Sequence, residues 1–226
     1  MASHLWSLQT FDPNEGFTII ERRLPHWAQP GTLCFLTWRT FDSMPRSVLN
    51  RWYADREEWL RKRNIDPHAA DWRTQLAALG QELHSDFVRT FSARWQRNLD
   101  FCHGACWLAQ PALSQIVADS LLKFDGDRYQ LTDFIVMPNH VHVLAAFIHE
   151  ERMLSQCTSW KHFTATQINR HIGKSGPFWQ QDGFDRLIRN ENEFEKTRRY
   201  IAENGQRAGL KPMEYRHYSK PLASTK

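Results

Sequence analysis

Two histidines separated by one residue, His140 and His142, are the residues of this 226-residue sequence whose types and spacing best suit chemistry. They begin an apolar, β-branched run that is typical of a strand, in which residues two apart point to the same face and Val141 and Val143 point to the other. Two neutral imidazoles side by side form half of a metal site, with positions open for a third ligand, water or a phosphate oxygen. The plainer alternative is that both histidines line a polar face of the sheet.

A second pair, Tyr200 and Asn204, is spaced by four residues in a segment predicted to be helical, so both side chains lie on one helix face. A phenol, whose unperturbed pKa is about 10, attacks phosphorus only when a metal polarises the phosphate or a neighbour helps to remove the proton. An amide oxygen is a neutral metal ligand. Taken alone, Tyr200 could be a packed tyrosine and Asn204 a helix-end residue. Combined with the histidine pair, they indicate metal-assisted attack on a phosphate.

The composition places these residues in an ordinary globular chain. Lys and Arg number 29 against 25 Asp and Glu, which gives a net charge of +4, and ten tryptophans are present. The basic excess and the aromatic rings lean towards a nucleic-acid partner. No apolar stretch reaches the roughly 20 residues of a membrane helix, and four cysteines make no dense disulfide framework. We therefore expect a cytoplasmic protein with no membrane partner.

Hydrophobic periodicity and turn residues predict the elements that position the candidate residues. Strands are predicted at residues 31–40, 128–137, 140–147 and about 184–189. Helices are predicted at residues 111–124, 151–172 and about 191–204. The last helix is the best signalled, because Asn190 and Glu193 can cap its start and Gly205 can end it.

The order of these elements describes a single α+β domain over residues 1–226, built on an antiparallel sheet. Residues 41–110 are predicted to be a helical insertion after the first strand, with one long apolar stripe running from Leu76 to Trp95. Residues before the first strand are predicted to be a loose arm, and residues 211–226 a loosely ordered tail.

Several motifs, in order, resemble those of the REP-associated tyrosine transposases, relatives of the HUH single-strand transposases of small bacterial insertion sequences. The motifs are MPNHVHVL from Met137, SWK from Ser159, FWQ from Phe178, DRLIR from Asp185, YIAEN from Tyr200 and AGL from Ala208. The resemblance covers roughly residues 31–210 and is densest from residue 108 onward. It departs from the family at Gly205, where proline is usual, a change that we expect to affect the helix stop more than the chemistry.

The resemblance implies a ferredoxin-like antiparallel sheet with the histidine pair on a central strand and the tyrosine helix against it. His140, His142 and Asn204 would bind one Mg or Mn ion. Tyr200 would attack a phosphate of single-stranded DNA beside a REP-type hairpin, leaving a 5′-phosphotyrosine link and a free 3′-OH, as a step of DNA transposition. We expect a monomer, with the helix-exchanged dimer of the insertion-sequence relatives as the alternative.

Basic and aromatic residues near the proposed site in the sequence are predicted to hold the DNA strand through phosphate contacts and base stacking. They are Lys161, Arg170, Lys174, Arg186, Arg189, Arg198, Arg199, Trp160 and Trp179. The alternatives are a solvated helix face for the cations and core packing for the two tryptophans.

The sequence is also compatible with two other functions. The first is a module that binds a nucleic-acid hairpin without cutting it. The second is a zinc protein that uses Cys102 and Cys106 with the histidine pair, although the sequence offers no second cysteine pair at zinc-ligand spacing.

Overall fold

The structure, a computed structural model, describes residues 8–221 except 17, 22–24 and 182, and it divides into two compact units. The first unit consists of Met1–Phe41 with Cys106–Lys226, and the second is Asp42–Ala105. The second unit falls within the predicted insertion. Among the described residues, none of the helices combines the length and apolar character needed to span a membrane.

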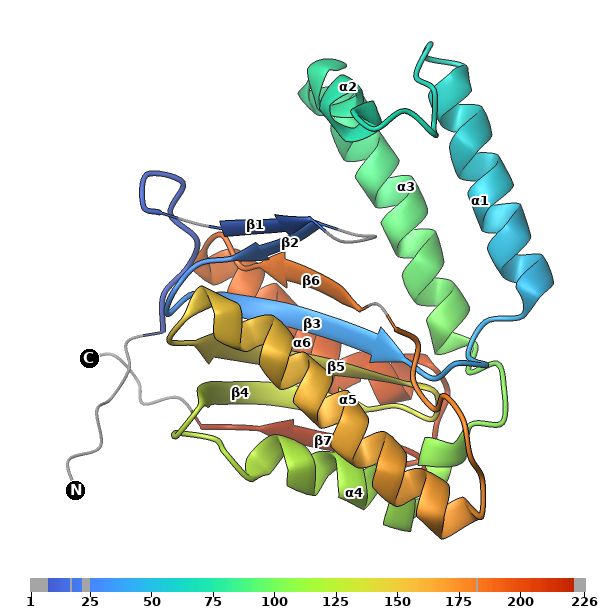
Figure 1. The fold of residues 1–226 in the computed structure, drawn as a ribbon, viewed down its shortest axis with the longest axis vertical. Helices are drawn as coiled ribbons and strands as arrows, with labels where there is room; N and C mark the ends of the chain where they lie inside the picture. The colour runs from blue at the N-terminus through green and yellow to red at the C-terminus, as the bar shows by residue number, and fades with distance from the viewer. Residues whose placement is uncertain (1–7, 17, 22–24, 182, 222–226) are drawn as a thin grey trace. The chain divides into compact units, whose positions relative to one another are not determined.

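A five-stranded antiparallel sheet forms the centre of the first unit (Figure 1). Its strand order is β6 (Phe184–Leu187), β3 (Leu33–Arg39), β5 (His140–Phe147), β4 (Tyr129–Val136) and β7 (Arg216–Ser219). The order β6-β3-β5-β4 is that of the ferredoxin-like, split βαβ arrangement, with β7 added at the edge. The predicted fold class is therefore confirmed, and the strand that carries the histidine pair lies in the middle of the sheet.

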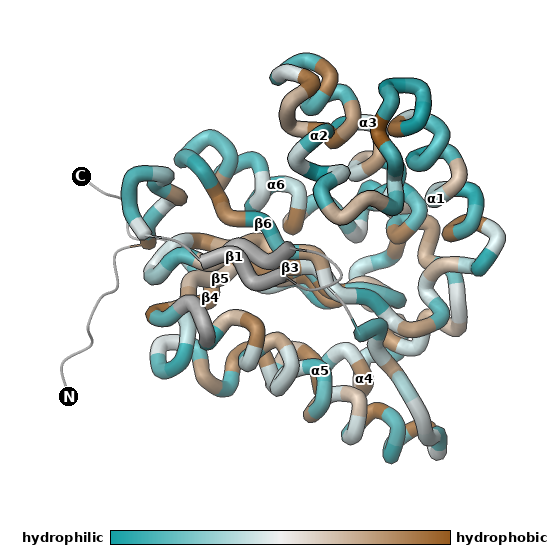
Figure 2. Tube along the Cα trace, turned by 45° about the horizontal axis from the view of Figure 1, so that its top comes forward, coloured by the Kyte–Doolittle hydropathy of each residue, from teal (hydrophilic) through white to brown (hydrophobic). Residues whose placement is uncertain are grey.

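Helices cover both faces of this sheet. Figure 2 shows α6 (Glu191–Arg207) on one side, and α4 (Pro111–Leu122) and α5 (Glu150–Ile172) on the other. Val141 and Val143 belong to the core under α4 and α5, whereas Leu144 belongs to the core under α6. Since side chains alternate along a strand, the histidine pair is on the α6 face.

Shorter elements complete the first unit. A separate antiparallel pair joins β1 (Thr18–Glu21) to β2 (Pro25–Ala28), and a 3₁₀ turn, η1 (Trp107–Ala109), precedes α4. The prediction of a loose arm missed this strand pair, because both strands are only four residues long and carry a weak alternation signal.

The second unit is a set of three helices: α1 (Arg46–Arg61), α2 (Trp72–Ala78) and α3 (Gln81–Asp100). Its core comprises Leu60, Ile65, Leu76, Phe87 and Phe91. The single stripe predicted from Leu76 to Trp95 is divided between α2 and α3 at Gly80, whose φ of +91° is a left-handed value that suits glycine.

The C-terminal segment differs from prediction in two ways. First, α6 runs to Arg207, so Gly205 lies inside the helix; a Cβ placed there would overlap the ring of Tyr215, and the close approach of this ring explains the glycine. Second, Arg216–Ser219 pairs with β4 as β7, so this part of the predicted loose tail is ordered. A four-residue edge strand of polar character gives no periodic signal in the sequence. Residues 222–226 of that predicted tail lie outside the described residues.

Candidate active site

The histidine pair lies in the centre of the sheet, and both residues are fully buried. The two rings are 4.7 Å apart between centroids. His140 Nδ1 is 2.7 Å from Asn139 Oδ1, and His142 Nδ1 is 2.7 Å from Thr37 Oγ1 on the neighbouring strand. Because a carbonyl oxygen only accepts, Nδ1 of His140 carries the proton and Nε2 has the lone pair. Histidines that bind metals usually donate their other ring N–H to an oxygen in this way.

Burial keeps both imidazoles neutral. It lowers the pKa of His140 from the ordinary 6.5 to about 3. Burial, and secondarily the neighbouring His140, lowers the pKa of His142 well below the ordinary value. At neutral pH both rings are therefore in the unprotonated form, which is the form that binds a metal ion.

Tyr200 approaches this pair from α6. Its Oη is 3.3 Å from Nε2 of His142, and the two rings are 5.3 Å apart. Phe35 on β3 stacks on His142 at 5.2 Å and meets the Tyr200 ring edge-on at 6.0 Å. The start of α6 is fixed by reciprocal bonds, since Asn190 Oδ1 accepts the N–H of Glu193 and Glu193 Oε2 accepts the N–H of Arg189, both at 2.9 Å. The helix start thus helps to set the position of the phenol.

Asn204 lies one turn after Tyr200 on the same helix and has 1% of its surface exposed. Its Oδ1 has no hydrogen-bond partner among the residues that the structure describes. An unpaired buried amide oxygen is destabilising, which makes such an atom a marker of a missing ion or ligand. The amide oxygen is a donor that suits Mg²⁺ or Mn²⁺, and neutral imidazole nitrogens suit transition metals, so of the two implied metals the set fits Mn²⁺ better.

The zinc alternative finds no support. Within the described part of the chain, no three or more His, Cys, Asp or Glu side chains form a group that could hold a metal ion. Cys102 and Cys106 are not joined in a disulfide and are partly buried. Both have a φ of +49°, a left-handed value typical of a turn. We therefore drop the prediction of a Cys and His zinc site.

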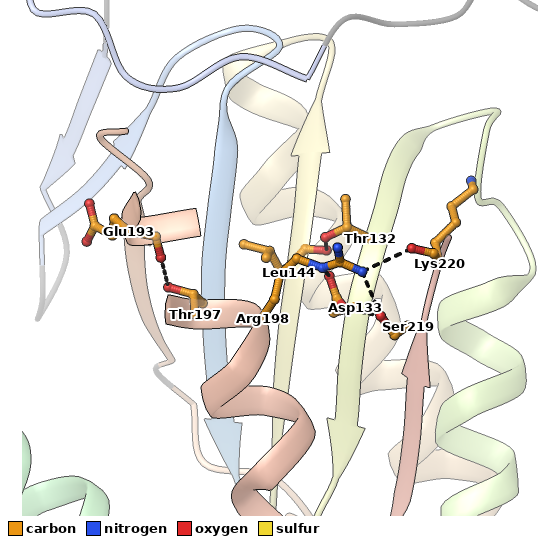
Figure 3. Close-up of polar contacts among 8 residues, drawn as sticks. All are labelled: Thr132, Asp133, Leu144, Glu193, Thr197, Arg198, Ser219 and Lys220. Atoms are coloured by element: carbon orange, nitrogen blue, oxygen red, sulfur yellow. Dashed lines mark hydrogen bonds and ion pairs between the residues drawn. The ribbon is translucent and has the colours of Figure 1, made fainter. Parts of the chain in front are cut away.

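Arg198 is held within the protein rather than presented to DNA (Figure 3). Its Nε donates to Asp133 Oδ2 at 2.9 Å, and its Nη2 donates to Ser219 Oγ at 2.7 Å and to the carbonyl of Lys220 at 3.1 Å. Ser219 Oγ in turn donates to Asp133 Oδ1 at 2.6 Å. The network joins α6 to β4 and β7, so the prediction of a DNA contact at Arg198 is wrong.

Asp133 is a structural partner of the site that the sequence reasoning missed. Its side chain has only 1% of its surface exposed. The signal was present in the sequence, as a lone carboxylate within the apolar strand YQLTDFIV. A carboxylate buried in this way requires a partner, which the structure shows to be Arg198.

Both tryptophans predicted to stack on bases are instead buried. Trp160 has 2% of its surface exposed and donates to Tyr129 Oη at 3.3 Å. Trp179 has 6% exposed and donates to Thr164 Oγ1 at 2.9 Å. Each indole N–H already has a partner in the core, so the stacking prediction is wrong for both residues.

The remaining predicted DNA contacts divide between the two faces of the sheet. Lys161 and Arg170 belong to α5, and Lys174 follows its C-terminal end, on the side away from α6. Arg199 is exposed on α6. Arg186 and Arg189 line a cleft of about 480 Å³ together with Tyr200, Phe35 and Lys196. Only Arg186 and Arg189 are thus shown beside the tyrosine.

Comparisons with known proteins give one structural match. No protein-family model matches the sequence, and no curated protein matches it either. A solved structure described as a REP-associated tyrosine transposase bound to a REP hairpin aligns with 91% of this chain and 98% of its own, at 12% sequence identity and a TM-score of 0.42. The matched protein is of the family that the sequence motifs resemble.

Proposed function

We propose that the chain cuts single-stranded DNA beside a hairpin, through attack of Tyr200 on a phosphate, and rejoins strands by the reverse step. The observation that carries the proposal is the 3.3 Å separation between Tyr200 Oη and His142 Nε2. The phenol of Tyr200 thus lies beside a buried, neutral histidine pair, and Asn204, whose amide oxygen is unpaired among the described residues, lies one helical turn away. The motif resemblance supports the choice of DNA as substrate and of transposition as the process.

Tyr200 is the nucleophile of the proposed reaction. Tyr200 Oη forms a bond to phosphorus while the bond from phosphorus to the 3′ oxygen breaks, and the phenol loses its proton as the 3′ oxygen gains one. The products are a 5′-phosphotyrosine and a 3′-OH. The energy of the phosphodiester is retained in the tyrosyl ester, so a second 3′-OH can reverse the step without ATP.

His140, His142 and Asn204 would hold the divalent metal, Mg²⁺ or Mn²⁺. When bound, the metal would polarise the phosphate and stabilise the charge that develops on its oxygens. Asn139 and Thr37 fix the orientation of the two imidazoles through their Nδ1 contacts. Asp133 and Arg198 fix the helix that carries the nucleophile.

Tyr200 and the histidine pair of the same chain lie together, so a monomer would suffice for the proposed reaction, with a helix-exchanged dimer as the alternative. The alternative of a hairpin-binding module that does not cut accounts less well for a phenol placed against two buried imidazoles. Such a module would need the exposed cations but not this polar centre in the sheet.

The test is formation of a covalent adduct. The full-length protein is incubated with Mn²⁺ and a pool of labelled hairpin oligodeoxynucleotides whose single-stranded flanks are randomised, and the products are separated under denaturing conditions. We expect a protein–DNA adduct with the natural chain and none with Tyr200→Phe. Absence of any adduct, with hairpin binding retained, would favour the non-cutting module.

A further inference from the structure

The cleft beside Tyr200 is the feature of the first unit that the proposed reaction leaves unexplained. Its volume of about 480 Å³ is within the roughly 300–1,000 Å³ of pockets that enclose small ligands. It is formed by β3, by β6 and the residues that follow it, and by the first half of α6. A space of this size suits one unpaired nucleotide, whereas a base-paired stem is too large for it.

The charges in the cleft favour an anion. Arg186, Arg189 and Lys196 are basic, and Glu193 is the acidic residue among those that line the cleft. The carboxylate of Glu193 is already engaged, with Oε1 3.3 Å from Arg186 Nη1 and Oε2 accepting the N–H of Arg189. The side chains of Arg189 and Lys196 are exposed and have no ion-pair partner among the described residues. Two cations therefore remain for a phosphate.

The floor of the cleft connects it to the candidate active site. Phe35 and Tyr200 line the cleft, and both rings also contact His142. A ligand in the cleft therefore lies against Tyr200. Asn192, which is exposed at the cleft, presents an amide that can both donate to and accept from the edge of a base.

Resting on the proposed function, we infer that this cleft binds the single-stranded nucleotide next to the phosphate that Tyr200 attacks. Arg189 and Lys196 contact the backbone phosphate of that nucleotide, and Asn192 contacts its base. The cleft thus selects unpaired DNA at the cutting position, because a base in a stem cannot present its pairing edge to Asn192.

Affinity for a plain single strand tests this inference. All proteins carry Tyr200→Phe, so that no covalent step intervenes, and the probe is fluorescein-labelled oligodeoxythymidylate of 12 nucleotides. Arg189→Ala combined with Lys196→Ala is compared with a matched double variant, Lys123→Ala with Arg152→Ala. These two control cations are exposed, one after α4 and the other on α5, on the opposite face of the sheet.

We expect the cleft variant to bind the probe about tenfold more weakly at 50 mM NaCl, and its salt slope to fall by about 0.7, because the two cations contact the same phosphate. The control should bind as the parent does, and melting curves should show that both variants are folded. Equal affinities and slopes for the two double variants would overturn the inference. Failure of the proposed function would give a different result. The chain with Tyr200 would then bind this probe normally but form no covalent adduct with DNA.

Discussion

The guanidinium Nε of Arg198 lies 2.9 Å from Oδ2 of Asp133, so the helix that carries Tyr200 is bonded to the strand beside the histidine pair. Asp133 is almost fully buried, and one-fifth of the Arg198 side chain is exposed. Arg198 lies two residues before Tyr200 in the sequence. It therefore restricts both the sliding and the rotation of α6, on which the distance between Tyr200 and His142 depends.

Removal of the Arg198 guanidinium should destabilise the fold. Arg198→Ala leaves the Asp133 carboxylate buried with Ser219 as its remaining partner, and we expect a loss of about 2–3 kcal/mol in the free energy of unfolding. Arg199→Ala removes an exposed neighbouring charge and should change it by less than about 0.5 kcal/mol. Urea denaturation of the two variants measures the difference. Equal losses would show that the ion pair contributes little.

Binding of the proposed metal should be detected by a change in thermal stability. A metal that binds only the folded chain raises the melting temperature with its concentration, so we expect Mn²⁺ to raise it and EDTA to reverse the effect. Asn204→Ala removes the amide oxygen, and we expect at least about a tenfold rise in the Mn²⁺ concentration that is required. Asn50→Ala, at an exposed asparagine of α1, is the control. A Mn²⁺ response unchanged in Asn204→Ala would remove Asn204 from the ligand set.

Gly205→Ala should be destabilising, against the usual preference of helices. In an open helix interior, alanine is favoured over glycine by about 1 kcal/mol. Here the added Cβ would overlap the ring of Tyr215, so we expect a loss of about 1–3 kcal/mol in unfolding free energy. In a Tyr215→Ala background the same substitution should be neutral or stabilising. A stabilising Gly205→Ala in the natural background would contradict the packing described above.

Alkaline pH should weaken the core under α4 and α5 through Tyr129. This residue is fully buried and donates to the carbonyl of Leu121 at 2.7 Å, and burial raises its pKa from 10.0 to about 12. Its contribution is complete below pH 10 and is lost as pH rises to about 12, because only the unfolded state ionises in that range. The loss amounts to about 3 kcal/mol at 1.36 kcal/mol per pKa unit. Between pH 10 and pH 12, the free energy of unfolding of Tyr129→Phe should fall by about 3 kcal/mol less than that of the natural chain. Equal falls in the two proteins would show that the pKa of Tyr129 is not raised.

The sheet and the placement of the histidine pair could be predicted from sequence, for a physical reason. Strand alternation puts His140 and His142 on one face, and the apolar residues between and beyond them divide between two cores. The capping residues Asn190 and Glu193 predicted the start of α6 correctly. Local patterns of this kind depend only on residues that are near one another in the chain.

The rest depends on contacts between distant residues. Lys161 and Arg186 both lie in the part of the sequence that precedes Tyr200, yet Lys161 is on α5 and Arg186 lines the cleft on the other side of the sheet, which position along the chain does not reveal. Trp160 could equally stack on a base or fill a core, and only its neighbours decide between the two. Glycine is a residue type that commonly ends helices. Gly205 instead leaves room for the ring of Tyr215, ten residues later.

The polarity of the covalent link at Tyr200 tests the central claim most directly. A hairpin oligonucleotide labelled at its 3′ end, and the same oligonucleotide labelled at its 5′ end, are each incubated with the full-length protein and Mn²⁺. We expect the 3′ label to become attached to the protein on the peptide that contains Tyr200, and the 5′ label to be released on a shorter strand that ends in a 3′-OH. Attachment of the 5′ label, or a 3′-label adduct that persists in Tyr200→Phe, would contradict it.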